Sequence, residues 1–388
     1  MGTTTAIRRV AEPAPGHRRR PQHTAPLPGD AGAPRAQGGQ RGSSIYDVAR
    51  AAGVAPSTVS RAFSRPGRVN ARTAERIFAA ARGVGYRSGV LHGPTGQRTR
   101  SLAVVAADVS NPFDAEIIRG AHQAAGESGY TILLSHTRED AHFERDWTER
   151  ELCAVEGVLL TGSRMSHNAI RMLAKQRPLV LLNRRVPEVP SVITDNARGM
   201  RRAVEHLAGL GHQTVTYVAG PEASWADGTR WVALIEACHE LDLRFRRVGP
   251  CNTPTVHAGL DIAQEVLAQK PSAVIAYNDV MAIGVIKGMR RAGVQVPDDV
   301  SVIGFDNIAL AEIVDPELTT VAAPLRAMGI IGVKNLLAAI GGATPNREPI
   351  VLPVKLVVRG STGRRRRNDI SPAWGTTKLS GSVSTWTG

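Results

Sequence analysis

Short apolar runs alternate with helix-length amphipathic segments between Ser101 and residue 363, and this alternation limits the possible folds more than any other feature. The runs are rich in Val, Ile and Leu, which is typical of strands buried on both faces of a parallel sheet. They read LAVVAA, TILLS, GVLLT, LVLL, VTYVAG, AVIAY and VSVIGF. Strands separated by helices predict βαβ units, and therefore parallel sheets with helices on both faces.

The length of this region predicts two lobes, because about 260 residues exceed what one hydrophobic core usually holds. Helix-length segments lie between most of the strands, such as residues 114–128, 168–176, 196–210, 256–268 and 279–292. Ligands of such folds bind beyond the carboxyl ends of the strands or between lobes. The residues directly after each strand are therefore the first candidates for a binding site.

Amide, carboxylate and guanidinium groups dominate the positions after the strands, together with a few aromatic rings. The set is Asp108, Ser110, Asn111, Asn183, Arg184, Trp225, Arg230, Asn278, Asp279, Asp306 and Asn307. Such groups suit a hydroxyl-rich ligand, which needs paired donors and acceptors and an apolar face for stacking. A helix cap is the alternative role, and we favour it for Asp279, which precedes the segment VMAIG. For the two arginines, Asn278 and Asp306 we favour ligand contact.

Residues 43–87 differ from this body and predict three short helices. The first places apolar residues at i, i+3, i+4 and i+7 from Ile45, which gives it one buried face. Ser43 or Ser44 can cap this helix, and Gly53 is where it ends, because glycine tolerates a positive φ.

A second helix begins at Pro56, where a missing N–H costs nothing, and carries Val59 on its inner face. Asn70 caps the third helix. Three short helices with a tight glycine turn between the first two describe a helix-turn-helix module.

The outer face of the second helix carries Ser57, Ser60 and Arg61 at spacings of three and four residues. A short helix with such a face fits the major groove of DNA. Arg61 has the forked guanidinium that can bond O6 and N7 of guanine, Thr58 can bond a phosphate or a base, and Tyr46 can hold the backbone. A plain solvated surface is the alternative, but the glycine turn and the inward valines favour DNA.

Charge separates this module from the body. Residues 45–98 hold nine basic and two acidic residues, whereas residues 99–363 hold 27 and 29. A basic module on a neutral body indicates a polyanion as the partner of the module alone. Residues 1–42 and 364–388 are also basic and lack apolar periodicity, so we expect a disordered arm and a disordered tail that adds salt-sensitive affinity for DNA. Alternatively, residues 1–42 are not translated, because the start lies downstream.

Several motifs resemble the LacI (lactose repressor) family. The run IYDVARAAGVAPSTVSRAF, followed by RVNARTAERIFAAARGVGY, is similar to its DNA-binding module. The similarity continues through VSNPF, GPEASWADGTRW, AYNDVMAIG and VSVIGFDN, and then LTTVAAPL. It covers about residues 44–363, and its helix-turn-helix part is the most specific.

This resemblance implies a body like the periplasmic sugar-binding proteins, with two lobes crossed by three chain segments and a sugar or nucleobase bound between them. Matching motifs place Phe113 in the cleft, Asn183 where the family often has Asp, and Arg230 where an Arg grips the ligand. Asn278 and Asp306 match the Asn of the ND pair and the Asp that follows GF. The family is usually dimeric, which holds two DNA modules over a palindrome.

The sequence also departs from the family. The expected hinge helix at 88–100 contains Gly93, Pro94 and Gly96, which oppose a helix, so we predict a flexible hinge and a weaker central kink in the DNA. Ala55 replaces the usual Ser cap before the second helix. No aromatic ring stands near Pro254, where some members stack a ring on the ligand, and Trp225 is the candidate substitute.

Two other classes of function fit less well. A sugar transport protein with the same body needs export, and the sequence shows neither a secretory signal nor a periplasmic disulfide pattern, with only Cys153, Cys238 and Cys251. An enzyme of doubly wound fold should carry a motif such as G-x-G-x-x-G, H-E-x-x-H or G-x-S-x-G, and none occurs in the expected context. Activation instead of repression stays open, because operator position decides the sign.

We therefore predict an N-terminal all-α helix-turn-helix module followed by an α/β two-lobed periplasmic-binding-protein-like domain. The predicted parts are an arm at 1–42, the module at 43–87, a hinge at 88–100, the two-lobed domain at 101–363 and a tail at 364–388. The predicted DNA contacts are Tyr46, Pro56, Ser57, Thr58, Ser60, Arg61 and Asn70. The predicted effector contacts are Asn111, Phe113, Asn183, Arg184, Trp225, Arg230, Asn278 and Asp306.

The function that follows is a cytoplasmic, nucleoid-associated regulator, most simply a repressor. Its predicted partners are palindromic double-stranded operator DNA, a sugar or sugar derivative as effector, and a second copy of the chain. We expect no membrane association, since no apolar stretch of about 18 residues occurs. We also expect no catalytic residue, metal or cofactor.

Overall fold

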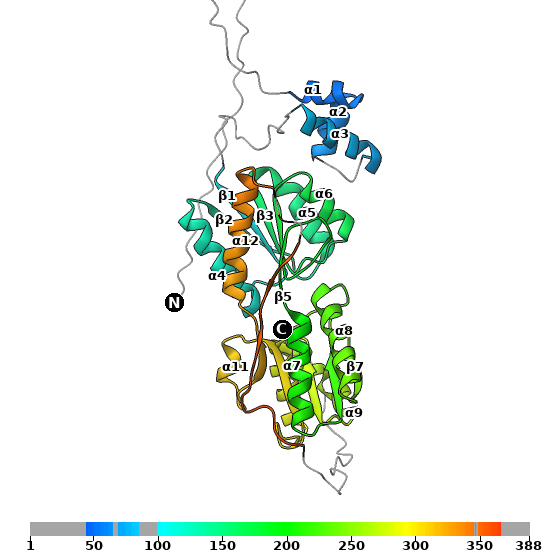
Figure 1. Cartoon of the computed structure of the whole chain (residues 1–388), viewed down its shortest axis with the longest axis vertical. Helices are drawn as coiled ribbons and strands as arrows, with labels where there is room; N and C mark the ends of the chain where they lie inside the picture. Colours follow the sequence, from blue (N-terminus) through cyan, green and yellow to red (C-terminus); the bar gives the residue numbers. More distant parts are fainter. Residues whose placement is uncertain (1–43, 65–68, 85–98, 345, 347, 366–388) are drawn as a thin grey trace, which may run out of the picture. The chain divides into compact units, whose positions relative to one another are not determined.

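The computed structural model describes residues 44–64, 69–84, 99–344, 346 and 348–365 (Figure 1). The expected arm, nearly all of the expected hinge and most of the expected tail lie outside these residues.

The helix-turn-helix module has the three helices that the sequence predicts: α1 (Ile45–Ala52), α2 (Pro56–Ser64) and α3 (Ala71–Gly83). Ser44 caps α1 in a capping box with Asp47, whose Oδ2 accepts hydrogen bonds from Ser44 N at 2.8 Å and Ser44 Oγ at 2.7 Å. Gly53 ends α1 with φ of 61°. The first and third helices therefore begin at the predicted caps, Ser44 and Asn70.

A small apolar core holds the three helices together. Val48, Val59 and Ile77 come one from each helix and are fully buried. The rings of Phe63 and Phe78 meet edge to face, with centroids 5.2 Å apart. This core fixes which side of α2 faces outward.

The body contains two six-stranded sheets, which we call the first and second lobes. The first-lobe sheet has the order β11-β5-β4-β3-β1-β2, and all its strands are parallel. Its strands are β1 (Ser101–Ala106), β2 (Thr131–His136), β3 (Gly157–Thr161), β4 (Leu179–Leu182), β5 (Ser191–Thr194) and β11 (Ile350–Leu352). Its helices are α4 (Pro112–Glu127), α5 (Ala141–Glu151), α6 (His167–Ala174) and α12 (Leu325–Ile340), with a 3-10 turn at Leu152–Ala154.

The second-lobe sheet repeats this arrangement, with the order β12-β10-β9-β8-β6-β7 and only β12 antiparallel. Its strands are β6 (Thr214–Val218), β7 (Arg244–Val248), β8 (Ala273–Ala276), β9 (Ser301–Asp306), β10 (Thr319–Ala322) and β12 (Lys355–Val357). Its helices are α7 (Asn196–Gly209), α8 (Trp225–Glu240), α9 (Val256–Ala268), α10 (Asp279–Arg291) and α11 (Leu310–Ile313). Each lobe thus uses strands from both ends of the body.

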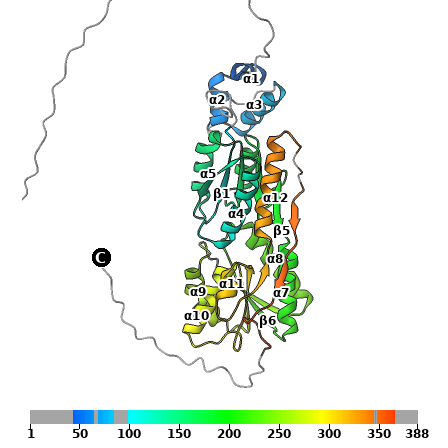
Figure 2. The same ribbon diagram turned by 90° about the vertical axis from the view of Figure 1, so that its left-hand side faces the viewer.

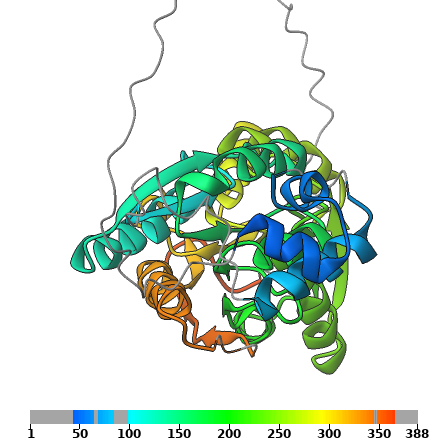
Figure 3. The ribbon, with the colours of Figure 1, turned by 90° about the horizontal axis from the view of Figure 1, so that it is seen from above.

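The chain passes between the lobes three times, after β5, after β10 and after β11. The second crossing brings the chain back to the first lobe, where α12 packs on α4 (Figures 1 and 2). The third crossing then leads from β11 to β12 in the second lobe. In the view from above, α12 (orange) lies at the periphery of the body (Figure 3). Two lobes and three crossing segments are what the sequence resemblance implied.

In each lobe, two helices pack backbone to backbone at a glycine. On α12, a Cβ added at Gly329 would lie 2.1 Å from the carbonyl oxygen of Ile117 in α4. In the second lobe, a Cβ at Gly284 of α10 would lie 2.1 Å from the carbonyl oxygen of Val256 in α9. Only glycine permits backbones to approach this closely.

Among the described residues, no helix is long and apolar enough to cross a membrane.

Candidate functional site

The outer face of α2 is a solvent-facing polar surface. Pro56, Ser57, Ser60 and Arg61 are exposed and Thr58 is half-buried, while Val59 points into the module core. Arg61 lies along the helix, since its Nε donates to Ser57 O at 3.2 Å and its Nη2 to Ser57 Oγ at 3.4 Å. The guanidinium is thus held at the face that a DNA groove would meet.

The two predicted DNA contacts outside α2 lie at helix starts. Tyr46 is in the first turn of α1 and its ring is exposed. Asn70 is the N-cap of α3, and its Oδ1 accepts a hydrogen bond from Arg72 N at 3.0 Å. Helix N-termini carry free N–H groups that suit phosphate oxygens, so both positions fit backbone contact.

Residues after the strands of both lobes meet in a cavity of about 30 Å³, which has room for about two water molecules. Six of the eight predicted effector residues line it: Asn111, Phe113, Asn183, Arg230, Asn278 and Asp306. The remaining lining residues are Ala107, Asp114, Glu139, Gly162, Arg164, Pro254 and Tyr277. The conformation described is therefore closed around very little space.

Arg230 is the fixed cation of this cavity. It is buried, its Nε donates to Asn196 Oδ1 at 2.9 Å, and its Nη1 donates to the Tyr277 carbonyl oxygen. The guanidinium stacks on the Phe305 ring at 3.6 Å from the centroid, and its Nη2 lies 3.6 Å from Asp306 Oδ1. These contacts immobilise the group, which then needs no reorganisation when a ligand arrives.

Backbone strain occurs at two equivalent places on the cavity wall. Asn183 follows β4 with φ of 55°, and Asp306 ends β9 with φ of 117°. The two strands hold the same position in their sheets. Such conformations are costly for residues other than glycine, and they cluster at ligand clamps.

These two side chains also present acceptors without donors. Asn183 Oδ1 and Asp306 Oδ1 are buried and accept no hydrogen bond. Burial raises the pKa of Asp306 well above its usual range, opposed by Arg230 and reinforced by Asp279 and Asp114. A buried acceptor without a donor is costly, so a ligand that donates hydrogen bonds would stabilise this wall.

Asn278, and not Asp279, caps α10. Asn278 Oδ1 accepts a hydrogen bond from Met281 N at 3.0 Å and so caps the helix. The same residue also lines the cavity. Asp279 is fully buried and accepts hydrogen bonds from Thr320 Oγ1 and, at 2.9 Å, from Ile308 N. The interpretation of Asp279 as the cap was therefore wrong, because Asn278 holds that position. Burial raises the pKa of Asp279 to about 7.

Arg184 and Trp225 do not line the cavity. Arg184 is buried, and its Nη1 donates to the Ser163 carbonyl oxygen within the first lobe. Burial lowers the pKa of its guanidinium, with Glu144 opposing that effect. Trp225 is half-buried and packs against the second-lobe core. Their contact with an effector stays a prediction.

Sequence reasoning missed four polar lining residues: Asp114, Glu139, Arg164 and Tyr277. Glu139 and Arg164 each lie three residues after the end of a strand, β2 and β3 respectively, where the rule of polar residues after strands could have found them. Tyr277 was counted as part of its strand. Asp114 lies inside the first turn of α4, where an acid also suits the helix dipole and therefore attracts no notice.

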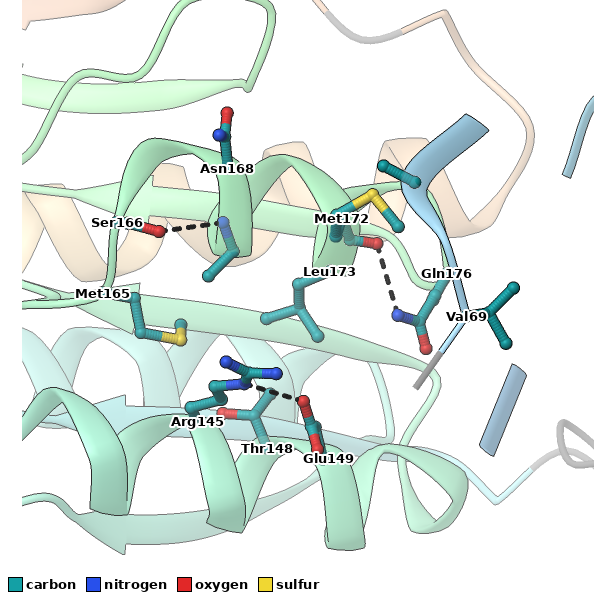
Figure 4. A pocket seen from close by; sticks show the side chains of 12 residues that line it. Val69, Arg145, Thr148, Glu149, Met165, Ser166, Asn168, Met172, Leu173 and Gln176 are labelled. Carbon is teal, nitrogen blue, oxygen red and sulfur yellow. Dashed lines mark hydrogen bonds and ion pairs between the residues drawn. The ribbon is translucent and has the colours of Figure 1, made fainter. Parts of the chain in front are cut away.

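A second, more open pocket lies between α5 and α6 (Figure 4). Arg145 and Glu149 of α5 form one wall with an ion pair of 2.9 Å, and Met165 and Leu173 line it on the side of α6. Gln176 Nε2 donates to the Met172 carbonyl oxygen. None of the pocket residues holds a buried polar atom without a partner, so the cavity between the lobes is the better ligand site.

Within the described part of the chain, no group of three His, Cys, Asp or Glu side chains is placed to hold a metal ion.

Comparisons with known proteins agree across most of the chain. The family "Bacterial regulatory proteins, lacI family" matches residues 44–88, and the family "Periplasmic binding protein-like domain" matches residues 204–362. The HTH-type transcriptional repressor CytR of Escherichia coli is 33% identical over 341 residues, covering 82% of this chain and 96% of CytR.

Two solved structures have the same fold. A regulator from Enterococcus faecium with bound ribose is 28% identical with a TM-score of 0.62, covering 69% of this chain and 100% of that one. The lac repressor dimer bound to operator and an anti-inducer is 26% identical with a TM-score of 0.63, covering 83% and 100%.

Proposed function

The chain belongs to the lacI family of bacterial regulatory proteins, and from that membership we infer that it is a DNA-binding transcriptional repressor controlled by a small-molecule effector. The observation that carries the DNA-binding part is the outer face of α2, where Ser57, Ser60 and Arg61 are exposed opposite a buried valine. We propose that this face reads base edges in the major groove. Tyr46 and Asn70 fix the register by holding phosphates.

We further propose that the effector is a sugar or sugar derivative bound in the cavity between the lobes. Amide, carboxylate and guanidinium groups from both lobes support this proposal, as does the ring of Phe113. The cavity of about 30 Å³ is far too small for a sugar, so the lobes must part to admit one. Effector control follows if the effector binds the open and closed states with different affinities.

The regulator is proposed to act in the cytoplasm as a homodimer on a palindromic operator. Both lobes expose apolar side chains that a second copy would cover, on β2 in the first lobe and on α11 in the second. A two-fold dimer would present two copies of α2 to two half-sites.

The test is a selection of fragmented genomic DNA by the purified full-length protein at near-physiological salt, followed by sequencing. We expect a palindromic consensus. With Arg61→Ala, enrichment at the guanine that Arg61 contacts should be lost, with a penalty of about 1–3 kcal/mol on the consensus site.

Arg76→Ala is the matched control, because Arg76 is also an exposed arginine of the module but lies on α3. We expect it to weaken binding to all sequences alike and to leave the consensus unchanged. Enrichment by the wild-type protein without any consensus would contradict sequence-specific regulation, and an unchanged consensus with Arg61→Ala would remove Arg61 from the reading face.

A further inference from the structure

Charged side chains line the closed cavity from both lobes, and each lobe contributes one ion pair between an arginine and a carboxylate. Arg164 Nε lies 2.6 Å from Glu139 Oε2 in the first lobe. Arg230 and Asp306 pair in the second lobe at 3.6 Å. Each arginine on the wall therefore already has a carboxylate, and the two pairs leave no net charge.

Asp114 is the carboxyl group left over on this wall. Its side chain is buried and lines the cavity. Its Oδ1 accepts a hydrogen bond from Thr161 Oγ1 at 2.6 Å, and its Oδ2 accepts one from Asp108 N at 3.0 Å. None of the ion pairs in the described part of the chain includes Asp114.

The second lobe shows what completes such a group. Asp227 holds the equivalent place, because both residues are the third of their helix and both accept from the backbone N–H two residues past the first strand. Asp227 also accepts from Tyr217 Oη at 2.8 Å, and its Oδ2 pairs with Arg247 Nη2 at 2.7 Å. The same local arrangement thus has a cation in the second lobe and lacks one in the first.

Burial without a cation has the expected electrostatic effect. Desolvation raises the pKa of Asp114 to about 7, and the hydrogen bonds from Thr161 and Asp108 offset only part of this. Glu139 on the same wall raises it and Arg164 lowers it, while Asp306 faces it from the other lobe together with Arg230. An ionised Asp114 therefore needs a positive group in the cavity.

The buried atoms without hydrogen-bond partners on this wall point to the same kind of ligand. They are Asn183 Oδ1 from the first lobe and Asp306 Oδ1 from the second, and both are acceptors. A ligand that satisfies them must donate hydrogen bonds to both lobes at once. Hydroxyl and ammonium groups do so, whereas a carboxylate or phosphate cannot.

We propose that the effector is an amino sugar or a related amino polyol, and that its protonated amine pairs with Asp114 of the first lobe. This rests on the proposed effector site and adds the chemical class. The ammonium group takes at Asp114 the place that Arg247 holds at Asp227. The hydroxyl groups of the ligand donate to the remaining acceptors of the cavity.

Calorimetric titration of the full-length protein in an amine-free buffer tests this with matched ligands. The probes are D-glucosamine, D-glucose and N-acetyl-D-glucosamine, and the corresponding galactose series. We expect at least one amino sugar to bind about tenfold or more tightly than both its neutral parent and its N-acetyl derivative, because a buried charged pair is stronger than a neutral hydrogen bond. Asp114→Asn should reduce that preference to about threefold or less while the parent sugar keeps its affinity.

Asp146→Asn is the control, since Asp146 is exposed on α5 of the same lobe and does not line the cavity, and the preference should survive it. If Asp114→Asn does not fold, the comparison of the three ligands on the wild-type protein still decides. Equal or tighter binding of a neutral sugar overturns the proposal but leaves effector control intact. Absence of binding by every amino sugar also overturns the proposal. Failure of the proposed function would appear separately, in the DNA selection, because that experiment contains no sugar.

Discussion

At the scale of single residues, His212 shows how a buried titratable group fastens one part of the chain to another. Its Nε2 lies 3.2 Å from the Gly363 carbonyl oxygen and 3.0 Å from Ser301 Oγ, and its Nδ1 lies 3.1 Å from Ser272 Oγ. Because a carbonyl oxygen only accepts, the proton is assigned to Nε2, and Nδ1 accepts from Ser272. The neutral ring thereby attaches the segment after β12 to the second lobe.

This geometry predicts that the protein loses stability in mild acid. Burial lowers the pKa of His212 below 6.5, and the nearby charges of Arg365 and His206 lower it further, against the opposing bond to Gly363. Below pH 6.5 His212 binds a proton in the unfolded chain but stays neutral in the folded protein. The free energy of unfolding therefore falls as the pH falls from 6.5 toward the lowered pKa of the folded state. Urea unfolding at pH 7.5 and 5.5 should show a smaller decrease for His212→Gln than for the wild type.

His122→Gln is the control, because His122 is exposed on α4. It should keep the wild-type decrease. A His212→Gln protein with the full wild-type decrease would show that other groups cause the acid sensitivity.

The sequence predicts a cavity residue correctly where its position along the chain determines whether it lines the cavity. It fails where the direction of the side chain determines this. Asn183 and Asp306 lie at the carboxyl ends of equivalent buried strands in the two lobes, so their positions in the chain place each of them at the edge that faces the cavity. Arg184 has an equally good position, but its side chain turns to the Ser163 carbonyl oxygen. Asp114 is buried, and no local sequence pattern reveals this.

At the scale of elements, the glycine contacts between helices are the most sensitive to substitution. Gly329→Ala on α12 should place a methyl group against the backbone of α4, where the neighbour is a carbonyl oxygen and cannot move aside. We expect a loss of about 2–4 kcal/mol in the free energy of unfolding from the strained core, measured by urea denaturation.

Gly228 on α8 provides the matched control, because a Cβ added there meets nothing within 4 Å. Gly228→Ala should stabilise the protein by about 0.5–1 kcal/mol, since alanine loses less backbone entropy in a helix. Equal effects of the two substitutions would refute the packing explanation.

The elements that the sequence predicts are those with strong periodicity and clear caps. The segment 256–268 has the bounds of α9, which Thr255 caps, whereas the other four predicted helices differ from the structure by one or two residues at their ends. Strands β5, β10, β11 and β12 were not predicted, because each has only three or four residues and all but β11 contain Ser, Thr or Lys. β7 (RFRRV) was missed because it is an arginine-rich edge strand with little burial.

At the scale of the whole molecule, the exposed apolar residues bear on assembly. β2 exposes Leu133 and Leu134 at the edge of the first-lobe sheet, and α11 exposes Leu310 and Ile313 in the second lobe. Water contact at such side chains is unfavourable, and a second copy of the chain would remove it. The proposed homodimer thus has an apolar contribution from each lobe.

Sedimentation velocity over a dilution series should show a dimer for the wild-type protein. Ile313 is 75% exposed, and Ile313→Asp should raise the dimer dissociation constant by about tenfold or more, because it buries a charge in the interface. The control is Val232→Asp on α8, where the replaced side chain is 52% exposed and the dimer should persist. If both variants dimerise like the wild type, α11 is not part of the interface.

The three crossings between the lobes also govern the order in which the protein can be made. The first-lobe sheet is complete only with β11, and α4 is covered only by α12, yet both elements follow the last helix of the second lobe in the chain. A ribosome synthesises the chain from its N-terminus, and domains generally fold as their residues emerge. The first lobe must therefore wait, with the face of α4 that packs against α12 uncovered, until nearly all of the second lobe has been synthesised. Neither lobe is therefore complete until its last strand, β11 in the first lobe and β12 in the second, has been synthesised, although the first lobe is begun much earlier.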